Sequence, residues 1–464
     1  METVTMDLSL AELRRGARAV PVESVDRARL AAARRRLDTA QRRWLDAAGF
    51  DAAAGTFCLL PDAQGRAARV LAGVDADEPL WAFGALAHAL PEGNYTLAEE
   101  GVLAERELAA LGWALGAYRY VRYRAPKRAP ARLLLPKTML AALTPLVDAA
   151  ARVRDLVNTP TEDLGPEQLA DAVLALAKEH GAKTRAFVGE QLLQAGFPTI
   201  HAVGRASHRP PRLVELAWGD PKHPRLVLVG KGVCFDSGGL DLKTSEGMRW
   251  MKKDMGGAAH ALALAGLVMQ ARLPVCLTLL VPAVENAVAG NALRPGEVIR
   301  TRAGHTVEVD NTDAEGRLIL CDALAYAAEQ QPDLIVDFAT LTGAARVALG
   351  PDLPALFANR DDLADAVLAA ARAVRDPLWR LPLWRPYRKL LESYLADFAN
   401  AGSSRHAGAI TAALYLERFV PETTPWLHVD VYAWNDADRP GRPKGGEAQG
   451  LRAFFRFLEE RYAR

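Results

Sequence analysis

The sequence has few of the features that mark disulfide-stabilised or membrane-spanning proteins. Only four cysteines occur among 464 residues, at positions 58, 234, 276 and 321, and no two have CxxC spacing. Neither a disulfide framework nor a cysteine-based zinc site is therefore indicated. No apolar run reaches the roughly 18 residues of a transmembrane helix, and the first twenty residues lack the apolar core of a secretory signal peptide. We therefore expect a cytoplasmic protein without a membrane segment.

An excess of charge of one sign is also lacking. Lys and Arg number 57 against 56 Asp and Glu, which gives a net charge of +1 and argues against an acidic tail or a chain that coats nucleic acid. Arginine-rich stretches at 34–36 and 122–132 fit solvated helix faces or loops, with a contact surface for anions or nucleic acid as the alternative. The composition is ordinary for a globular protein, and the length allows two or three domains of roughly 150 residues.

The first 140 residues predict a small α/β domain. Apolar runs at 56–60 and 68–71 flank a Pro-Asp-Ala-Gln-Gly turn, which favours a β-hairpin. Helical patterns follow at about 79–89 and 97–115. We assign residues 1–140 to this N-terminal domain and expect it to serve assembly or regulation.

Residues 141–464 predict a larger domain of alternating strands and helices. The predicted strands are the wholly apolar run 226–229 and the mainly apolar runs 275–282 and 334–338, and the predicted helices lie at about 140–158, 257–271 and 316–330. This alternation predicts a mixed, mostly parallel sheet flanked by helices. In such sheets, ligands bind beyond the carboxyl ends of the strands.

Three loops at predicted strand ends combine carboxylates with glycine. They span residues 229–243, 251–257 and 310–318. Their four candidate acids are Asp236, Asp254, Asp313 and Glu315. Four carboxylates are enough to bind two divalent cations, which together can activate a water and polarise a carbonyl. Taken singly, each acid also fits a turn or a helix cap.

The spacing within the loops adds further expectations. In an extended segment, Asp313, Glu315 and Arg317 would point the same way, and two neighbouring carboxylates are unfavourable unless a cation joins them. Lys231, between two glycines, fits a surface lysine or a phosphate-loop lysine, although the GxxxxGK[ST] spacing is absent. Lys243 follows a glycine turn and is expected to project into the same pocket.

Residues 311–318 read NTDAEGRL, which resembles the signature of the leucyl aminopeptidase (cytosol aminopeptidase) family. The resemblance extends through VGKGVCFDSGGLDLK, MKKDMGGAA and DFATLTGA, and it covers about 155–464. It implies a metal-dependent aminopeptidase that hydrolyses the N-terminal residue from peptides with a hydroxide activated by two metal ions. The motifs are uninterrupted, which disfavours a catalytically dead scaffold.

The resemblance also implies roles for individual residues. The ligands of a tighter metal would be Lys231, Asp236, Asp254 and Glu315. The ligands of a second, more exchangeable metal would be Asp236, Asp313 and Glu315, with the Asp313 carbonyl added. Lys243 and Arg317 would be catalytic without binding metal. As a ligand, Lys231 must be a neutral amine, so its pKa would have to be strongly lowered.

The family further implies partners and cofactors. We expect two divalent ions per subunit, zinc or manganese and alternatively magnesium or cobalt, because carboxylate-rich sites accept several metals. A bicarbonate ion is expected at Arg317, near the start of a helix whose free N–H groups favour anions. A homohexamer that acts on peptides is expected, with no membrane partner and no nucleic acid.

The pocket for the first side chain departs from the family pattern. The resemblance places Met251, Thr340, Leu341, Thr342, Gly343 and Tyr432 along this pocket. The family usually reads His-Leu-Asp-Ile-Ala-Gly where this chain reads His-Val-Asp-Val-Tyr-Ala-Trp. Tyr432 and Trp434 therefore either narrow the pocket or point elsewhere, and a preference for leucine does not follow.

Two alternative functions belong to other classes. A DNA-binding or regulatory role alongside catalysis would use the basic stretch at 122–132. A two-metal phosphoesterase is disfavoured because the loops match the aminopeptidase motifs throughout. Elsewhere, Cys234 and His260 are interpreted as packing residues, and His428 and Asp430 as structural support.

Overall fold

The computed structural model describes residues 9–402 and 404–463, which divide into two compact units. The smaller unit contains the described residues up to 151 together with 435–445. The larger unit contains residues 152–434 and the described residues from 446 onward. Helix α5 (Lys137–Asn158) has residues in both units, and the expected boundary at 140/141 falls within it.

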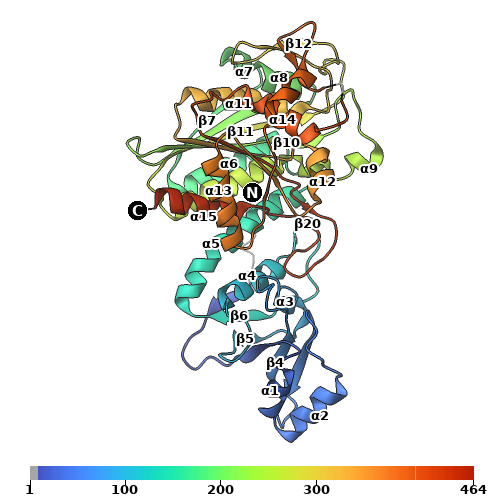
Figure 1. The fold of residues 1–464 in the computed structure, drawn as a ribbon, viewed down its shortest axis with the longest axis vertical. Helices are drawn as coiled ribbons and strands as arrows, with labels where there is room; N and C mark the ends of the chain where they lie inside the picture. The colour runs from blue at the N-terminus through green and yellow to red at the C-terminus, as the bar shows by residue number, and fades with distance from the viewer. Residues whose placement is uncertain (1–8, 403, 464) are drawn as a thin grey trace. The chain divides into compact units, whose positions relative to one another are not determined.

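The smaller unit is built on one six-stranded sheet (Figure 1). In sheet order its strands are β1 (Leu10–Glu12), β6 (Arg132–Leu135), β5 (Asn94–Leu97), β2 (Val20–Val25), β4 (Ala67–Gly73) and β3 (Phe57–Pro61). Its helices are α1 (Leu30–Arg35), α2 (Thr39–Ala47), α3 (Leu86–Ala89) and α4 (Arg106–Ala117). β3 and β4 pair antiparallel, which confirms the predicted hairpin.

Two helix predictions in this unit are wrong in their extent. The segment 79–89 is helical only over α3, and 97–115 begins with the end of strand β5 and a loop before α4. β5 pairs in parallel with both β2 and β6, so partners distant in sequence decide its conformation. The basic stretch at 122–132 is mostly loop, and Arg128 donates a 2.6 Å hydrogen bond to the Leu90 carbonyl.

The larger unit contains a nine-stranded sheet. Its order is β16 (Trp379–Arg380), β15 (Ala355–Ala358), β18 (Trp426–Asp430), β14 (Leu334–Ala339), β9 (Arg225–Gly230), β11 (Cys276–Asn286), β8 (Arg212–Trp218) and β7 (Lys183–Val188), with β10 (Gly232–Asp236) also paired to β11. The central pairs β18–β14, β14–β9 and β9–β11 are parallel, whereas β15, β8 and β7 add antiparallel pairs. The sheet is therefore mixed and mostly parallel, as the sequence predicts.

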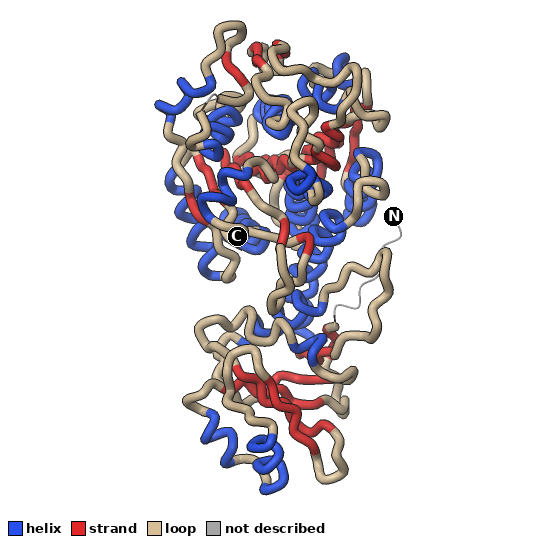
Figure 2. The backbone as a smooth tube through the Cα atoms, turned by 90° about the vertical axis from the view of Figure 1, so that its right-hand side faces the viewer, coloured by secondary structure: helices blue, strands red, loops and turns tan. Residues whose placement is uncertain are grey.

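Helices cover both faces of this sheet, as Figures 1 and 2 show. One face carries α6 (Pro166–His180), α10 (Gly256–Gln270), α13 (Asp361–Ala373) and α15 (Leu451–Tyr462), and the other carries α8 (Pro198–Gly204), α11 (Glu315–Glu329) and α14 (Gly408–Glu417). Residues 226–229 of β9 have no exposed surface. Because helices cover both faces of the strand, all of its side chains are buried, which explains why this segment is apolar throughout.

Shorter elements complete the larger unit. They are α7 (Gln191–Gln194), α9 (Ser245–Met248), the 3₁₀ helix η1 (Met251–Met255), α12 (Gly343–Leu349), the 3₁₀ helix η2 (Arg385–Leu391), β12 (Val298–Arg300), β13 (Thr306–Glu308) and β17 (Phe398–Ala399). The two-residue strands β19 (Trp434–Asn435) and β20 (Gly445–Gly446) pair with each other, and each has one residue in either unit. In the part of the chain that the structure describes, no helix has the length and apolar character needed to cross a membrane.

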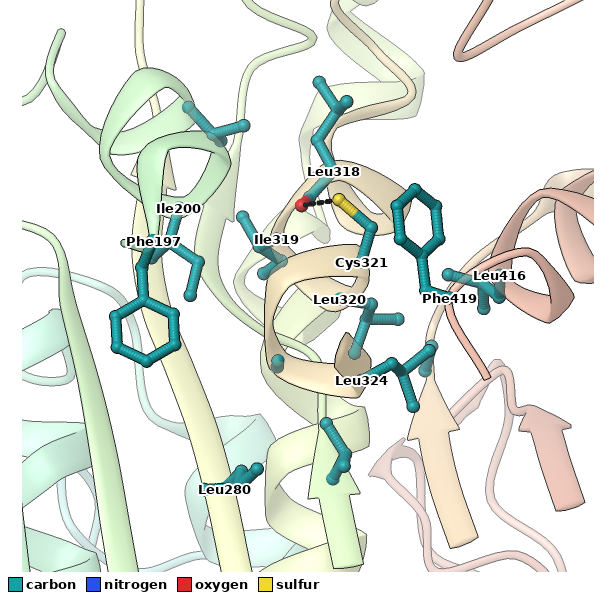
Figure 3. Packing of buried hydrophobic residues seen from close by; sticks show 14 of the residues in the cluster. Phe197, Ile200, Leu280, Leu318, Ile319, Leu320, Cys321, Leu324, Leu416 and Phe419 are labelled. Atoms are coloured by element: carbon teal, nitrogen blue, oxygen red, sulfur yellow. Dashed lines mark hydrogen bonds between the residues drawn. The ribbon is translucent and has the colours of Figure 1, made fainter. Parts of the chain in front are cut away.

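Helix α11 is fixed in the core by its leucine-rich stretch. Figure 3 shows Leu318, Ile319 and Leu320 between Phe197, which directly precedes α8, and Phe419. All three α11 side chains are fully buried. Burial of such a side chain contributes roughly 1.5–3 kcal/mol, so the first turn of α11 is held firmly in place. That turn carries two of the candidate site residues.

Candidate active site

The candidate residues gather at one edge of the larger sheet, beyond the carboxyl ends of its parallel strands. Lys231 follows β9 and Asp236 ends β10, whereas Thr340 follows β14 and Asp430 ends β18. Parallel strands bring their carboxyl ends to the same edge. Four segments that are far apart in the sequence therefore contribute to one site.

Three carboxylates form the centre of the site. Asp236, Asp313 and Glu315 each offer an oxygen within 4.8 Å of the others. Burial and then the nearby Asp236 charge raise the pKa of both Asp313 and Glu315. Crowded, buried carboxylates of this kind bind divalent cations, since a cation removes their mutual repulsion.

Lys231 lies deep in this cluster and is 2% exposed. Its Nζ is 2.8 Å from Asp254 Oδ2 and 2.9 Å from Glu315 Oε1, and it donates a 2.8 Å hydrogen bond to the Thr340 carbonyl. Burial lowers the pKa of Lys231, but the surrounding carboxylates outweigh burial and raise it. Lys231 thus links Asp254 to Glu315 as an ammonium, and a role as a neutral metal ligand would require a bound cation to displace its proton.

Gly316 explains how Lys231 can approach so closely. A Cβ atom at position 316 would lie 2.5 Å from Cε of Lys231 and 2.7 Å from its Nζ. Real Cβ contacts are essentially never that short, so any larger residue at this position would displace the Lys231 side chain from its contacts. The glycine in the NTDAEGRL segment is therefore a packing requirement of the site.

Lys243 lies in the loop after β10 and contacts two of the three central carboxylates. Its Nζ lies 2.8 Å from Asp236 Oδ2 and donates a hydrogen bond to Asp313. Burial lowers the pKa of Lys243, but the charges of Asp236, Glu315 and Asp313 raise it. The expectation that Lys243 projects into the pocket is met by this geometry, and the side chain there carries a positive charge.

Arg317 lies in the first turn of α11 and is 9% exposed. Its guanidinium donates a 2.5 Å hydrogen bond to the carbonyl of Asn400. The expected extended conformation over 313–317 is wrong, because α11 begins at Glu315. Asp313, Glu315 and Arg317 nevertheless line the same pocket, since the helix turns Arg317 toward it.

Several supporting residues escape the motif-based reading. Asn286, at the end of β11, donates hydrogen bonds of 2.9 Å to Asp236 Oδ1 and 3.1 Å to the Thr312 carbonyl. The Asp241 carboxylate accepts a 2.7 Å hydrogen bond from the Thr312 backbone N–H. Such contacts fix metal ligands in place. The only signal for Asn286 in the sequence is its position at the end of an apolar run.

Asn400 and Asp430 hold two further loops. The Asn400 side chain accepts hydrogen bonds from the N–H groups of Asp310 and Asn311. Asp430 accepts a 2.6 Å hydrogen bond from the Thr342 hydroxyl and others from the N–H groups of residues 341 and 342. Asp430 is thus a structural residue, as the sequence predicts.

A pocket of about 390 Å³ opens above the carboxylates. Its lining includes all the candidates: Lys231, Asp236, Lys243, Met251, Asp254, Asp313, Glu315, Arg317, Thr340, Leu341, Thr342, Gly343 and Tyr432. Trp434 is not part of this lining, and its ring lies 5.8 Å from Lys252 Nζ. Of the two aromatic replacements, Tyr432 is therefore the one that lines the pocket.

The histidines and the buried thiol serve packing. His260 is fully buried, with Nδ1 hydrogen-bonded to the Gly256 carbonyl at 2.7 Å and Nε2 accepting from the Gln449 N–H at 2.9 Å. His428 Nδ1 lies 2.5 Å from Asp337 Oδ1, and both residues are fully buried. Cys234 is 1% exposed. None of the three histidine and cysteine side chains lines the pocket.

Comparisons with known proteins show the family of the chain. The catalytic-domain model of the cytosol aminopeptidase family matches residues 151–455, and the model of the M17 aminopeptidase N-terminal domain matches residues 20–136. The chain belongs to the cytosol aminopeptidase family. It is therefore a metal-dependent aminopeptidase, a hydrolase that removes the N-terminal residue of peptides.

Individual relatives resemble this aminopeptidase over most of its length. A probable cytosol aminopeptidase of Syntrophotalea carbinolica is 44% identical over 75% of this chain and 74% of its own. The crystal structure of the Coxiella burnetii cytosol aminopeptidase has a TM-score of 0.95 and 50% identity over 98% of this chain and 99% of its own. The bottromycin maturation enzyme BotP in complex with Mn has a TM-score of 0.86 and 36% identity, covering 96% and 99% of the two chains. These matches lend no support to the DNA-binding alternative.

Proposed function

We propose that this aminopeptidase binds two divalent cations through Lys231, Asp236, Asp254, Asp313 and Glu315. The observation that carries the proposal is the approach of three carboxylates, two of them buried, within 4.8 Å at the base of a pocket. Carboxylate oxygens are suitable donors for such cations. Asp236 and Glu315 would be shared by both cations, as the family resemblance implies.

The division of ligands between the two cations is the one that the family resemblance implies. Lys231, Asp236, Asp254 and Glu315 would hold one cation, and the contacts of Lys231 with Asp254 and Glu315 are consistent with this set. Asp236, Asp313 and Glu315, whose oxygens lie within 4.8 Å of one another, would hold the second. When bound, the cations would lower the pKa of a water and polarise the scissile carbonyl.

Lys243 is proposed as the residue that stabilises negative charge on the substrate oxygen. Its ammonium lies beside Asp236 and Asp313 and lines the pocket. A fixed positive charge at a site shielded from water stabilises an oxyanion more strongly than it would in solution. Arg317, at the N-terminal turn of α11, would hold the bicarbonate ion that the family resemblance implies, and such an ion would supply a group able to exchange protons.

A reconstitution assay tests the metal proposal. Chelator-treated protein should lose hydrolysis of aminoacyl amides, and zinc or manganese should restore it, with magnesium and cobalt as further additions. Manganese in the BotP complex supports that choice. Lys243→Ala should keep the bound metal, measured by elemental analysis, yet lose hydrolysis by orders of magnitude. Near-normal turnover of that variant would refute the role of Lys243.

Assembly and location complete the proposal. We expect a homohexamer in the cytoplasm, on the basis of the family resemblance, with residues 1–140 as a domain for assembly or regulation. Light scattering coupled to size-exclusion chromatography should give the mass of six chains. Cell fractionation tests the location, and a protein found in the membrane fraction would contradict it.

A further inference from the structure

The wall of the pocket contains two positively charged side chains, Lys253 and Arg346, that have no part in the proposed metal site. Lys253 Nζ lies 4.9 Å from the centre of the Tyr432 ring, and the Arg346 guanidinium lies 4.8 Å from the same centre. All three residues line the pocket. Lys253 is only 6% exposed, whereas Arg346 lies on the exposed side of α12. Tyr432 thus presents a phenol ring in contact with two positive groups.

Neither cation has a carboxylate partner. The other two lysines of the pocket, Lys231 and Lys243, form ion pairs with the central carboxylates. Across residues 9–402 and 404–463, Lys253 and Arg346 form no ion pair and donate no side-chain hydrogen bond.

The acids nearest Lys253 are engaged elsewhere. Asp254 is in contact with Lys231 and accepts a 2.8 Å hydrogen bond from the Thr340 hydroxyl. The oxygens of Asp430 accept hydrogen bonds from Thr342 and its neighbour. An almost fully buried ammonium without an ion pair is costly. Such a group is expected where an anion from outside the protein completes the site.

Tyr432 also limits the shape of that anion. Its ring stands at the pocket position where the family has a small residue, so a branched aliphatic side chain has less space. A short side chain ending in a carboxylate would meet the two cations at the wall and form charge-assisted hydrogen bonds with them. A neutral side chain would leave Lys253 desolvated and unpaired.

We propose that this aminopeptidase selects peptides whose first residue carries a carboxylate, aspartate or glutamate, through Lys253 and Arg346. The proposal rests on the proposed function, since it takes this wall as the pocket of the first side chain. The carboxylate at the far end of a dipeptide is the other anion a substrate could offer. Aminoacyl amides lack that group, so they separate the two sources.

The test compares glutamyl, glutaminyl, leucyl and alanyl p-nitroanilides on the metal-loaded full chain. Glutamine matches glutamate in shape but is neutral. We expect kcat/KM for the glutamyl substrate to exceed that for the glutaminyl substrate by about tenfold or more, as charge-assisted hydrogen bonds allow. Binding of free glutamate, measured by calorimetry, should be tighter than that of glutamine by a similar factor.

Variants locate the effect. In Arg346→Met and Lys253→Met, the ratio of glutamyl to glutaminyl kcat/KM should fall to about 2 or less. Arg372→Met removes an exposed arginine from α13, away from the pocket, and should keep the wild-type ratio. Arg346 does not touch the proposed metal ligands, so the substrate ratio of Arg346→Met tests the proposal even if Lys253→Met loses metal.

Each outcome has one reading. If the wild-type enzyme cleaves the leucyl or glutaminyl substrate with a kcat/KM equal to that for the glutamyl substrate, the acidic preference is refuted but the proposed function remains intact. Selectivity for acidic residues that survives in both variants refutes the role of Lys253 and Arg346. A metal-loaded protein that hydrolyses none of the four substrates overturns the proposed function and this inference together.

Discussion

Substituting Gly316 by alanine should disable the site while leaving the fold intact. The added Cβ would lie 2.5 Å from Cε of Lys231, where ordinary contacts exceed about 3.4 Å, so the lysine side chain must move by roughly 1 Å. Its Nζ has contacts of 2.8, 2.9 and 2.8 Å with Asp254, Glu315 and Thr340. A shift of that size breaks at least some of them.

The magnitude follows from the displacement. Misplacing a catalytic group by about 1 Å costs on the order of a hundredfold in rate, so Gly316→Ala should lower kcat/KM for an aminoacyl amide by about that factor. The loss of activity should not come from a less stable fold, since helix propensity alone predicts that Gly→Ala within a helix stabilises the protein by roughly 0.5–1 kcal/mol.

The assay combines steady-state hydrolysis under saturating manganese with thermal unfolding. Gly290→Ala is the matched control, because a Cβ at position 290 meets no atom within 4 Å and the residue lies outside the pocket. The control should keep wild-type activity. A folded Gly316→Ala protein with wild-type kcat/KM would show that the close packing of Lys231 against residue 316 does not matter for the reaction.

Two buried histidines give further predictions. Burial lowers the pKa of His260 from 6.5 to about 4. As the pH falls, the imidazole of His260 is therefore protonated in the unfolded chain before it is protonated in the folded protein. The free energy of unfolding should decrease by about 2–3 kcal/mol between pH 6.5 and 4. Urea unfolding across this range should show a flatter profile for His260→Gln, and coincident profiles would contradict the assignment. Asp337→Ala leaves His428 without its partner at 0% exposure and should cost about 3–5 kcal/mol. Asp46→Ala, which breaks an exposed pair with Arg34, should cost less than about 1 kcal/mol, and equal losses in the two variants would refute the argument from burial.

The sequence predicts the larger sheet well because its strands are read locally. Residues 226–229 are uniformly apolar and 334–338 are apolar except for Asp337, and the structure buries both segments between two helical layers. The same local reading fails at 97–115, where β5 is fixed by hydrogen bonds to β2 and β6. The residues of that segment alone do not predict its pairing with β2 and β6.

The candidate site shows the same contrast. Asp236, Asp313 and Glu315 stand in contiguous motifs, and the structure brings their oxygens together. Lys253 and Arg346 look like solvated charges in the sequence, because a Lys-Lys pair and a helical arginine are common at surfaces. Their meaning depends on Tyr432, which only the fold brings against them.

The central claim is that the carboxylate cluster binds the metal ions on which hydrolysis depends. The most direct measurement titrates chelator-treated protein with manganese or zinc while following bound metal and hydrolysis of an aminoacyl amide together. We predict two ions per chain, with activity recovering as they bind, and loss of both in Asp236→Asn, whose side chain is shared by the two proposed sites. Full hydrolysis by metal-free protein, or wild-type metal content and activity in Asp236→Asn, would contradict the account.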